Sequence, residues 1–250
     1  RLAELDPAAA RVDHELTLAA AAGARLVTVL DDDYPANLRP VRDLPPFLFL
    51  LGDNRGSGDV RSVAVVGTRH PTAVGLDRAA RWAEALVSRG VTVVSGLAKG
   101  VDAAAHDAAL RMRGRTVAVI GTGISRIYPP EHVELSQRIA ATGAVVSPFW
   151  PSMAPARWSF PRRNAVMAGI SQATLVIEAS ATSGAKLQAR LAHEQSKGVF
   201  LIPELVEAQE WARRYLDRGW AGEVGDVEEL LARLPPPQVS WQTQMTLDLT

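Results

Sequence analysis

The sequence predicts an α/β fold, in which an extended, Rossmann-like parallel sheet is covered by helices on both faces and preceded by a small N-terminal leader. Two observations support this prediction. From residue 61 onward, short runs rich in Val and Ile alternate with helical stretches. Each run is continuously apolar, which is typical of strands buried on both faces. The predicted strands are 63–66, 91–94, 117–120, 144–146, 175–177 and 199–202.

A helix is expected after each of these strands, because parallel neighbours need a long crossover connection. The predicted crossover helices are 76–88, 101–112, 131–141, 162–170, 184–196 and 206–218, followed by a short helix at 226–234. Ahead of the sheet, the residues predict an Ala-rich helix near 7–22, a strand at 25–29 and an apolar run, opened by prolines, at 44–52.

These elements suggest three segments. Residues 1–58 form the leader, which ends in a loop of Gly, Ser and Asp. Residues 59–234 form the Rossmann-like domain. Three prolines at 235–237 end the regular structure, so 235–250 is expected to be an extended or disordered tail.

Composition excludes several classes of protein. The 250 residues include no Cys, which excludes a disulfide scaffold, a thiolate zinc site and a cysteine nucleophile. No apolar stretch reaches the roughly 18 residues that suggest a membrane span, and the N-terminus lacks a signal-peptide pattern. We therefore expect a cytoplasmic protein with no membrane contact.

The net charge is zero, but the charges are segregated. Residues 61–203 hold 17 basic and 8 acidic residues, a net +9, whereas 1–60 and 204–234 each carry −4. This pattern favours a central domain that binds an anion, although clustering on a solvated surface would look the same.

Ligands of open α/β sheets bind at the carboxyl ends of the strands, so the loops after the strands are the candidate site. Gly67, Thr68 and Arg69 follow the first strand of the domain, and Gly96 and Lys99 follow the second. Glycines let the backbone approach a ligand closely, and the basic side chains supply donors for phosphate. The alternative is that these are ordinary strand-to-helix turns.

Later loops repeat this chemistry. The remaining candidates are Gly121, Gly123, Arg162, Arg163, Asn164, Ser183, Gly184 and Lys186. Arg162 and Arg163 follow Pro161 at a predicted helix start, where the helix dipole disfavours cations. We therefore assign both arginines to a bound anion and expect them at the surface, while Ser183 has the alternative role of an ordinary helix cap.

No catalytic or metal-ligating constellation stands out. Asp102 is explained by capping a helix, and His106 is better explained as a hydrogen-bonded core histidine than as a catalytic base. Glu178 is a lone acid at the end of a buried strand. The expectation is therefore a protein that is not an enzyme and that holds no metal or cofactor.

Five segments resemble, in chain order, the signature segments of the DprA/Smf family (DNA processing protein A). They read SVAVVGTRHPTAVG, VVSGLAKGVDAAAHDAAL, AVIGTGISRIYPPEH, FPRRNAVMAGIS and TLVIEASATSGAKLQARLA. Each segment alone is weak, but five in order are specific. The leader segment TVLDDDYPANLRPVRDLPPFLFLLGD also resembles the one that precedes this family's Rossmann domain.

The resemblance implies binding of single-stranded DNA, loading of a RecA-type recombinase during natural transformation, a homodimer and no enzymatic activity. It implies DNA contacts at positions already singled out: Gly67, Thr68, Arg69, Lys99, Arg162, Arg163 and Asn164. The chain departs from the family pattern at Ala165, Ala185 and Gln188, and an acidic helix follows the last strand. No winged-helix domain is expected after residue 234. These departures suggest a divergent paralogue.

Two alternatives to DNA binding remain at this point. One is a nucleotide-processing enzyme of the same superfamily, such as the phosphoribohydrolases of the LOG type. Those enzymes carry PGGxGTxxE at a strand-to-helix turn where this chain has EASATSG. The other alternative is a nucleotide-binding sensor, which needs a pocket but no catalysis.

Overall fold

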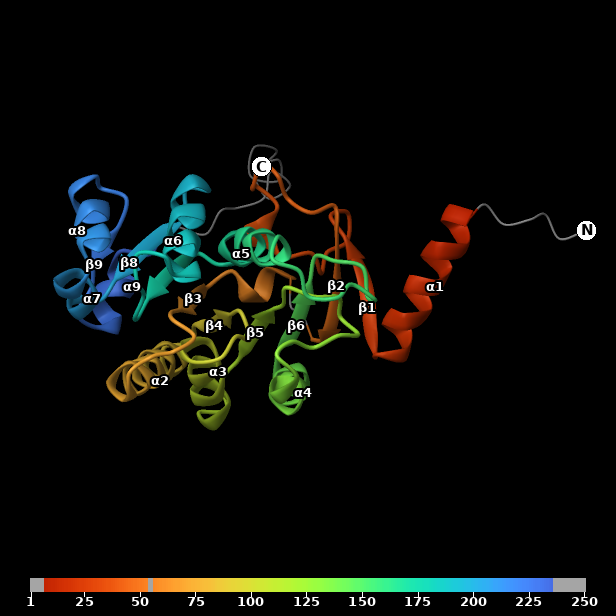
Figure 1. Ribbon diagram of the computed structural model, residues 1–250, viewed down its shortest axis with the longest axis horizontal. Helices are drawn as coiled ribbons and strands as arrows, with labels where there is room; N and C mark the ends of the chain where they lie inside the picture. The colour runs from red at the N-terminus through yellow and green to blue at the C-terminus, as the bar shows by residue number, and fades with distance from the viewer. Residues whose placement is uncertain (1–6, 54–55, 236–250) are drawn as a thin grey trace, which may run out of the picture.

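A computed structural model of the chain describes residues 7–53 and 56–235, so most of the predicted tail lies outside the described residues. Within them the strands form one nine-stranded sheet in the order β1-β2-β6-β5-β4-β3-β7-β8-β9 (Figure 1). The strands are β1 Ala24–Thr28, β2 Phe47–Gly52, β3 Ser62–Val66, β4 Thr92–Ser95, β5 Thr116–Val119, β6 Ala144–Ser147, β7 Ala173–Val176, β8 Gly198–Leu201 and β9 Gly222–Glu223.

The predicted strands are confirmed as β3 to β8, and all of these pair in parallel. The leader contributes the strands at one edge of the same sheet. β2 pairs antiparallel with both β6 and β1, so the sheet is mixed rather than wholly parallel. At the other edge lies β9, which was not predicted because its two residues are too few to show a hydrophobic pattern.

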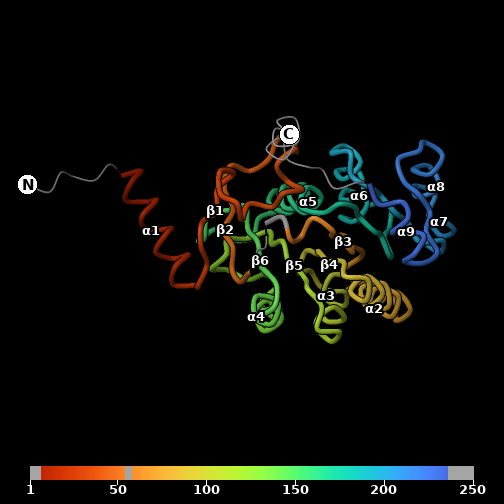
Figure 2. The backbone as a smooth tube through the Cα atoms, turned by 180° about the vertical axis from the view of Figure 1, so that it is seen from behind, coloured from red at the N-terminus to blue at the C-terminus, as the bar shows by residue number. Residues whose placement is uncertain are grey.

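Helices cover both faces of the sheet, as predicted. Helices α2, α3 and α4 lie on one face, and α5 and α6 lie on the other (Figures 1 and 2). The α-helices are α1 Pro7–Ala21, α2 Ala73–Ser88, α3 Val101–Arg111, α4 Val133–Thr142, α5 Ser159–Ile170, α6 Gly184–Glu194, α7 Pro203–Ala208, α8 Glu210–Asp217 and α9 Val227–Ala232. Short 3-10 helices span Ala36–Leu38, Gly56–Asp59 and Pro130–His132.

Two helix predictions need correction. The single helix expected at 206–218 is wrong, because Gln209 adopts an extended backbone (φ −128°, ψ 119°) that separates α7 from α8. Helix α5 begins at Ser159, ahead of the expected start at 162. Arg162 therefore ends the first turn of α5 and Arg163 lies in the second turn, which changes where both side chains point.

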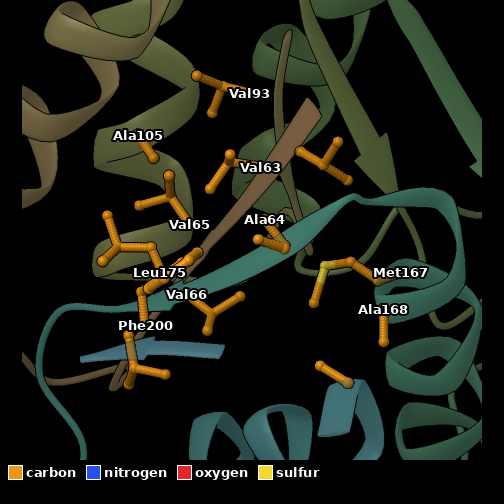
Figure 3. Close-up of a cluster of buried hydrophobic side chains, with 14 of the residues drawn as sticks. Val63, Ala64, Val65, Val66, Val93, Ala105, Met167, Ala168, Leu175 and Phe200 are labelled. Carbon is orange, nitrogen blue, oxygen red and sulfur yellow. The ribbon is translucent and has the colours of Figure 1, made fainter. Parts of the chain in front are cut away.

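The core lies on both sides of β3, which is buried along its whole length. Figure 3 shows Val63 and Val65 on the side of this strand that faces Ala105 of α3, and Ala64 on the side that faces Met167 of α5. Successive side chains of a strand point to opposite faces, so a continuously apolar strand fits only between two helical layers.

Hydrogen bonds tie the leader to this core. The Asn37 side-chain amide donates to the carbonyl oxygens of Val60 at 2.8 Å and Ile170 at 3.0 Å. The buried Lys197 ammonium donates to the Asn37 carbonyl at 2.7 Å. Burial lowers the pKa of Lys197 to about 8. Asn37 is thus joined to the end of α5 and to the residues just before β3 and β8.

Candidate ligand-binding crevice

Strands β4 to β6 lie on one side of β3, whereas β7 and β8 lie on the other side. The strand order therefore reverses between β3 and β7, and open α/β sheets form a ligand crevice at such a switch point. Two adjoining hollows lie there. The inner hollow has a volume of about 310 Å³ and is lined by the 66–70 turn, α5 and the start of α6. The outer hollow has a volume of about 220 Å³ and is lined by loops that follow β4 and β5. Both hollows are lined by Arg69, His70, Ala98, Phe160 and Arg163.

The turn after β3 carries Arg69 into the crevice. The Thr68 amide donates to the Glu178 carbonyl at 2.6 Å, which joins the turn to the end of β7. Gly67 is required by packing, because a Cβ there would lie 2.4 Å from Cγ2 of Val101. The exposed Arg69 guanidinium lies 5.2 Å from the centre of the Phe160 ring and makes no ion pair with any described residue. Its charge is therefore available to a ligand.

Two aromatic side chains complete this part of the crevice, and the sequence interpretation missed both. Phe160 lines both hollows, and the exposed Tyr128 lines the outer hollow. The centres of these two rings are 6.0 Å apart. Both residues precede prolines in motifs that we interpreted only for their basic and turn-forming residues. Aromatic rings beside an arginine are the usual platform for bases of single-stranded nucleic acid.

Arg163 is buried, which corrects the expectation that it is a surface cation. Its side chain is 4% exposed. Nη1 donates to the carbonyl oxygens of Gly96 and of Val119, the latter at 2.7 Å, and Nε donates to Asn164 Oδ1 at 3.0 Å. Burial lowers the pKa of Arg163 to about 10. Arg163 therefore fastens the ends of β4 and β5 beneath the crevice.

Asp102 is the buried acidic neighbour of Arg163. Its carboxylate accepts from the Ala98 amide at 3.3 Å, so it holds the loop before α3. Burial raises the pKa of Asp102, and the nearby Arg163 charge opposes that shift. A Cβ on Gly96 would lie 2.1 Å from Arg163 Nη1 and 2.7 Å from Asp102 Oδ2. Glycine at position 96 thus makes room for this buried pair.

Lys99 lies at the mouth of the outer hollow and is paired with Glu131. The hydrogen bond that Lys99 donates to the Glu131 carboxylate raises the pKa of Lys99. The Lys99 side chain remains 57% exposed. Lys99 therefore reaches solvent but shares its charge with a carboxylate, unlike Arg69.

The first turn of α6 opens onto the inner hollow. Ser183 caps this helix through a hydrogen bond from the Ala185 amide to Ser183 Oγ at 3.1 Å. The neighbouring Gly184 is exposed, and a Cβ there would meet no atom within 4 Å. Asn164 anchors the turn by donating to the Gly184 carbonyl at 3.3 Å. The positive end of the α6 dipole thus borders the same space as Arg69.

The N-terminus of α2 is closed by a carboxylate of the chain itself. Glu178 accepts hydrogen bonds from the Thr72 amide at 3.2 Å and from the Thr72 hydroxyl at 2.9 Å. Thr72 in turn caps α2. In dinucleotide-binding folds, the helix after the first strand receives the pyrophosphate at this position. Here Glu178 occupies that position.

His106 is a core histidine, as we expected. It is fully buried, and its Nδ1 lies 2.7 Å from the Thr116 hydroxyl oxygen. Burial lowers the pKa of His106 to about 3. The ring is therefore neutral at physiological pH and contributes to packing beneath the crevice.

The sequence also matches a known protein family. Residues 25–235 match the family described as DNA recombination-mediator protein A. The chain belongs to this family. The resemblance to DprA/Smf proteins that the five sequence segments indicated is confirmed.

Curated relatives within the DNA recombination-mediator protein A family cover most of the chain. Protein Smf of Synechocystis sp. is 44% identical over 193 residues, which make up 74% of this chain and 48% of the relative. DNA processing protein DprA of Bacillus subtilis is 31% identical over 220 residues, or 88% of this chain and 74% of the relative. The chain thus spans about half the length of the Synechocystis relative.

Solved structures of the family share the fold. The X-ray structure of DNA processing protein A from Streptococcus pneumoniae has a TM-score of 0.79 at 31% identity, over 93% of this chain and 84% of that one. DNA processing protein A from Helicobacter pylori has a TM-score of 0.73 at 27% identity, over 84% of this chain and 95% of that one.

Three of the predicted site residues do not line either hollow. Gly123 packs under the loop at 150–151, where a Cβ would lie 2.2 Å from two carbonyl oxygens. Lys186 lies with its ammonium 6.0 Å from the Trp211 ring centre. Arg162 points away from the crevice and lies 5.9 Å from the Trp158 ring centre. The other predicted positions line one hollow or the other: Gly67, Thr68, Arg69, Gly96, Lys99, Gly121, Arg163, Asn164, Ser183 and Gly184.

Across residues 7–53 and 56–235, no group of three or more His, Asp or Glu side chains could hold a metal ion. No helix in the same ranges is long and apolar enough to cross a membrane.

Proposed function

We propose that this chain binds single-stranded DNA in the crevice, with bases against the aromatic rings and phosphates against the basic and amide groups. The observation that carries the proposal is the arrangement of Arg69 over Phe160 between the two hollows, with Tyr128 beside them. Stacking surfaces interleaved with cations bind single strands without reading their sequence. The H. pylori structure concerns the single-stranded DNA binding mode of that related protein, which supports the same ligand here.

The two hollows suggest how a strand would lie. Arg69 and Lys99 are separate cations along the crevice, and the positive end of the α6 dipole borders its inner end. A path of this kind suits a linear polyanion better than a compact mononucleotide. Each phosphate neutralised would release counterions, so binding would weaken steeply with salt.

The geometry is less favourable to the nucleotide-processing and nucleotide-sensing alternatives. Glu178 already fills the position at α2 where a dinucleotide fold holds its pyrophosphate. Asp102, which lines the inner hollow, is buried beside Arg163. Neither carboxylate is free to transfer a proton to a ligand, so we propose a non-catalytic binding role.

The remaining expectations belong to the same proposal. They are the recombinase partner of the RecA type, a homodimer, a cytoplasmic location, and the division into a leader at 1–58 and a DNA-binding domain at 59–234. The family description as recombination mediators supports the recombinase partner.

Fluorescence anisotropy tests the ligand class. Labelled oligo-dT, labelled ATP and a labelled cyclic nucleotide are titrated with the protein at about 50 and 200 mM salt, a range over which a handful of phosphate contacts changes affinity by one to several decades. We expect tight, salt-dependent binding of oligo-dT only. Binding of a mononucleotide in preference to oligo-dT, or salt-independent binding, would contradict the proposal.

A further inference from the structure

An exposed tryptophan lies just outside the crevice, at the N-cap of α5. Trp158 is 55% exposed. Its ring meets the buried Phe149 ring edge-on, with centres 5.8 Å apart and planes at 83°. The Arg162 guanidinium lies 5.9 Å from the Trp158 ring centre. The indole is therefore held in place by its neighbours while much of its surface faces solvent.

The surroundings of Trp158 are basic. Arg157 and Arg162 are both exposed, and neither forms an ion pair with any residue in the described ranges. The acidic neighbour is Asp43, which lines a shallow hollow of about 410 Å³ together with Arg162 and Phe149 but does not pair with Arg162. Two unpaired arginines beside an exposed indole suit a ligand that carries both negative charge and flat rings.

The position of this patch relative to the crevice follows from the helical period. Successive residues of α5 are about 100° apart, so Trp158 and Arg162 lie on the side opposite Phe160 and Arg163. A helix is only about 10 Å across with its side chains. The exposed Pro161 lines the inner hollow and lies between the two sides. A strand leaving the inner hollow over Pro161 would reach Trp158 within a few nucleotides.

We propose that Trp158, Arg157 and Arg162 form a second contact for single-stranded DNA, outside the crevice, where a base stacks on the indole and the arginines bind the flanking phosphates. This inference rests on the proposed function, because the strand must first occupy the crevice. The sequence analysis assigned Arg162 to the ligand, but Arg162 does not line the crevice. In this second contact Arg162 would bind the ligand after all.

The test compares short and long oligo-dT binding to Trp158→Ala. Oligomers of about 4 and about 16 nucleotides bracket the site sizes typical of single-strand binders. We expect the variant to bind the short oligomer like the parent and the long one about tenfold more weakly, because loss of one stacked base costs a factor of this order. Trp158→Phe keeps a ring and should recover most of the loss.

Two further variants separate the possible outcomes. Arg162→Gln should weaken binding of the long oligomer and lower its salt slope by about one unit. Arg61→Gln is the matched control, because Arg61 is also exposed but lies just before β3, at the amino end of the parallel strands and away from the crevice at their carboxyl ends. This control should lose little affinity for either oligomer. Circular dichroism and the unfolding midpoint check that each variant is folded.

Three results would overturn the proposal. If the parent binds no oligomer, the crevice proposal fails as well. If the parent binds and Arg69→Gln weakens it, but Trp158→Ala binds the long oligomer like the parent, only the second contact fails. If Trp158→Ala leaves DNA binding unchanged but lowers the mass measured by sedimentation, the patch joins two copies of the chain instead.

Discussion

Arg163 at the floor of the crevice is 4% exposed, whereas Lys99 at its rim has 57% of its side chain exposed. The floor consists of Arg163, Asp102 and Gly96, and the rim carries Arg69 and Lys99. On the floor, the guanidinium of Arg163 donates hydrogen bonds to backbone carbonyl oxygens and to Asn164 Oδ1. On the rim, the exposed Arg69 guanidinium lies over the Phe160 ring and makes no ion pair with a residue in the described ranges.

The net charge of the domain counts buried and exposed cations alike, but the two kinds of cation have different roles. A buried cation must have its donors satisfied by the protein, so its removal damages the fold. An exposed cation without a carboxylate partner contributes little to stability and keeps its charge for a ligand. Floor variants should therefore change the free energy of unfolding, and rim variants should change binding.

Replacement of Arg163 should have the largest effect. Arg163→Met would leave Asp102 buried without its cation, and it would leave the Gly96 and Val119 carbonyls without this donor. Removing a buried cation that is hydrogen-bonded to its neighbours and lies beside a buried carboxyl costs about 3–5 kcal/mol. Urea unfolding followed by circular dichroism measures the loss.

The neighbouring Arg162→Met is the matched control for stability. Arg162 is exposed, so this variant should stay within about 0.5 kcal/mol of the parent. Equal stability of the two variants would contradict the assignment of Arg163 to the floor. The expectation from sequence that both arginines lie at the surface is wrong for Arg163, which is 4% exposed.

His106 lies beneath the floor and should make stability depend on pH. Burial lowers its pKa to about 3 from an ordinary 6.5. In the unfolded chain His106 is therefore protonated below about pH 6.5, whereas in the folded chain it stays neutral until near pH 3. His106 should lower stability as the pH falls through this window, by at most about 1.4 kcal/mol per pH unit.

His106→Gln removes this titration. Urea midpoints measured from pH 7 to 4.5 should fall less steeply for the variant than for the parent. Parallel curves would show that His106 is not excluded from protonation in the folded state.

Replacement of Lys99 should have the smallest effect, because Glu131 already shares its charge. Lys99→Gln should leave the unfolding midpoint unchanged and weaken oligo-dT binding by less than about fivefold. Glu131→Gln frees Lys99 and should strengthen binding slightly. If Lys99→Gln lost more affinity for oligo-dT than Arg69→Gln, Lys99 rather than Arg69 would be the more important rim cation, which would contradict this prediction.

The backbone of the crevice could be predicted from sequence, because buried strands and glycine turns leave strong local patterns. The continuously apolar runs identified β3 to β8, and the loops after them meet at the switch point. The antiparallel direction of β2 and the break at Gln209 could not be predicted, since both depend on pairing and packing across the chain.

The direction of individual side chains was harder to predict. Arg162 and Arg163 are adjacent, yet one turns outward and the other is buried, because α5 begins at Ser159 rather than near Pro161. Phe160 was missed for a related reason: an apolar residue at a helix start is usually explained by packing. Only its place between the two hollows shows that it can serve a ligand.

The central claim is that the rim binds the ligand, and Arg69→Gln tests it most directly. The affinity of the parent and the variant for oligo-dT is measured across a series of salt concentrations, with Arg214→Gln on α8 as the control. We predict that Arg69→Gln keeps the parent's unfolding midpoint, binds about tenfold more weakly and lowers the salt slope by about one unit, whereas the control binds normally. A folded Arg69→Gln variant with the parent's affinity and salt slope would contradict the account.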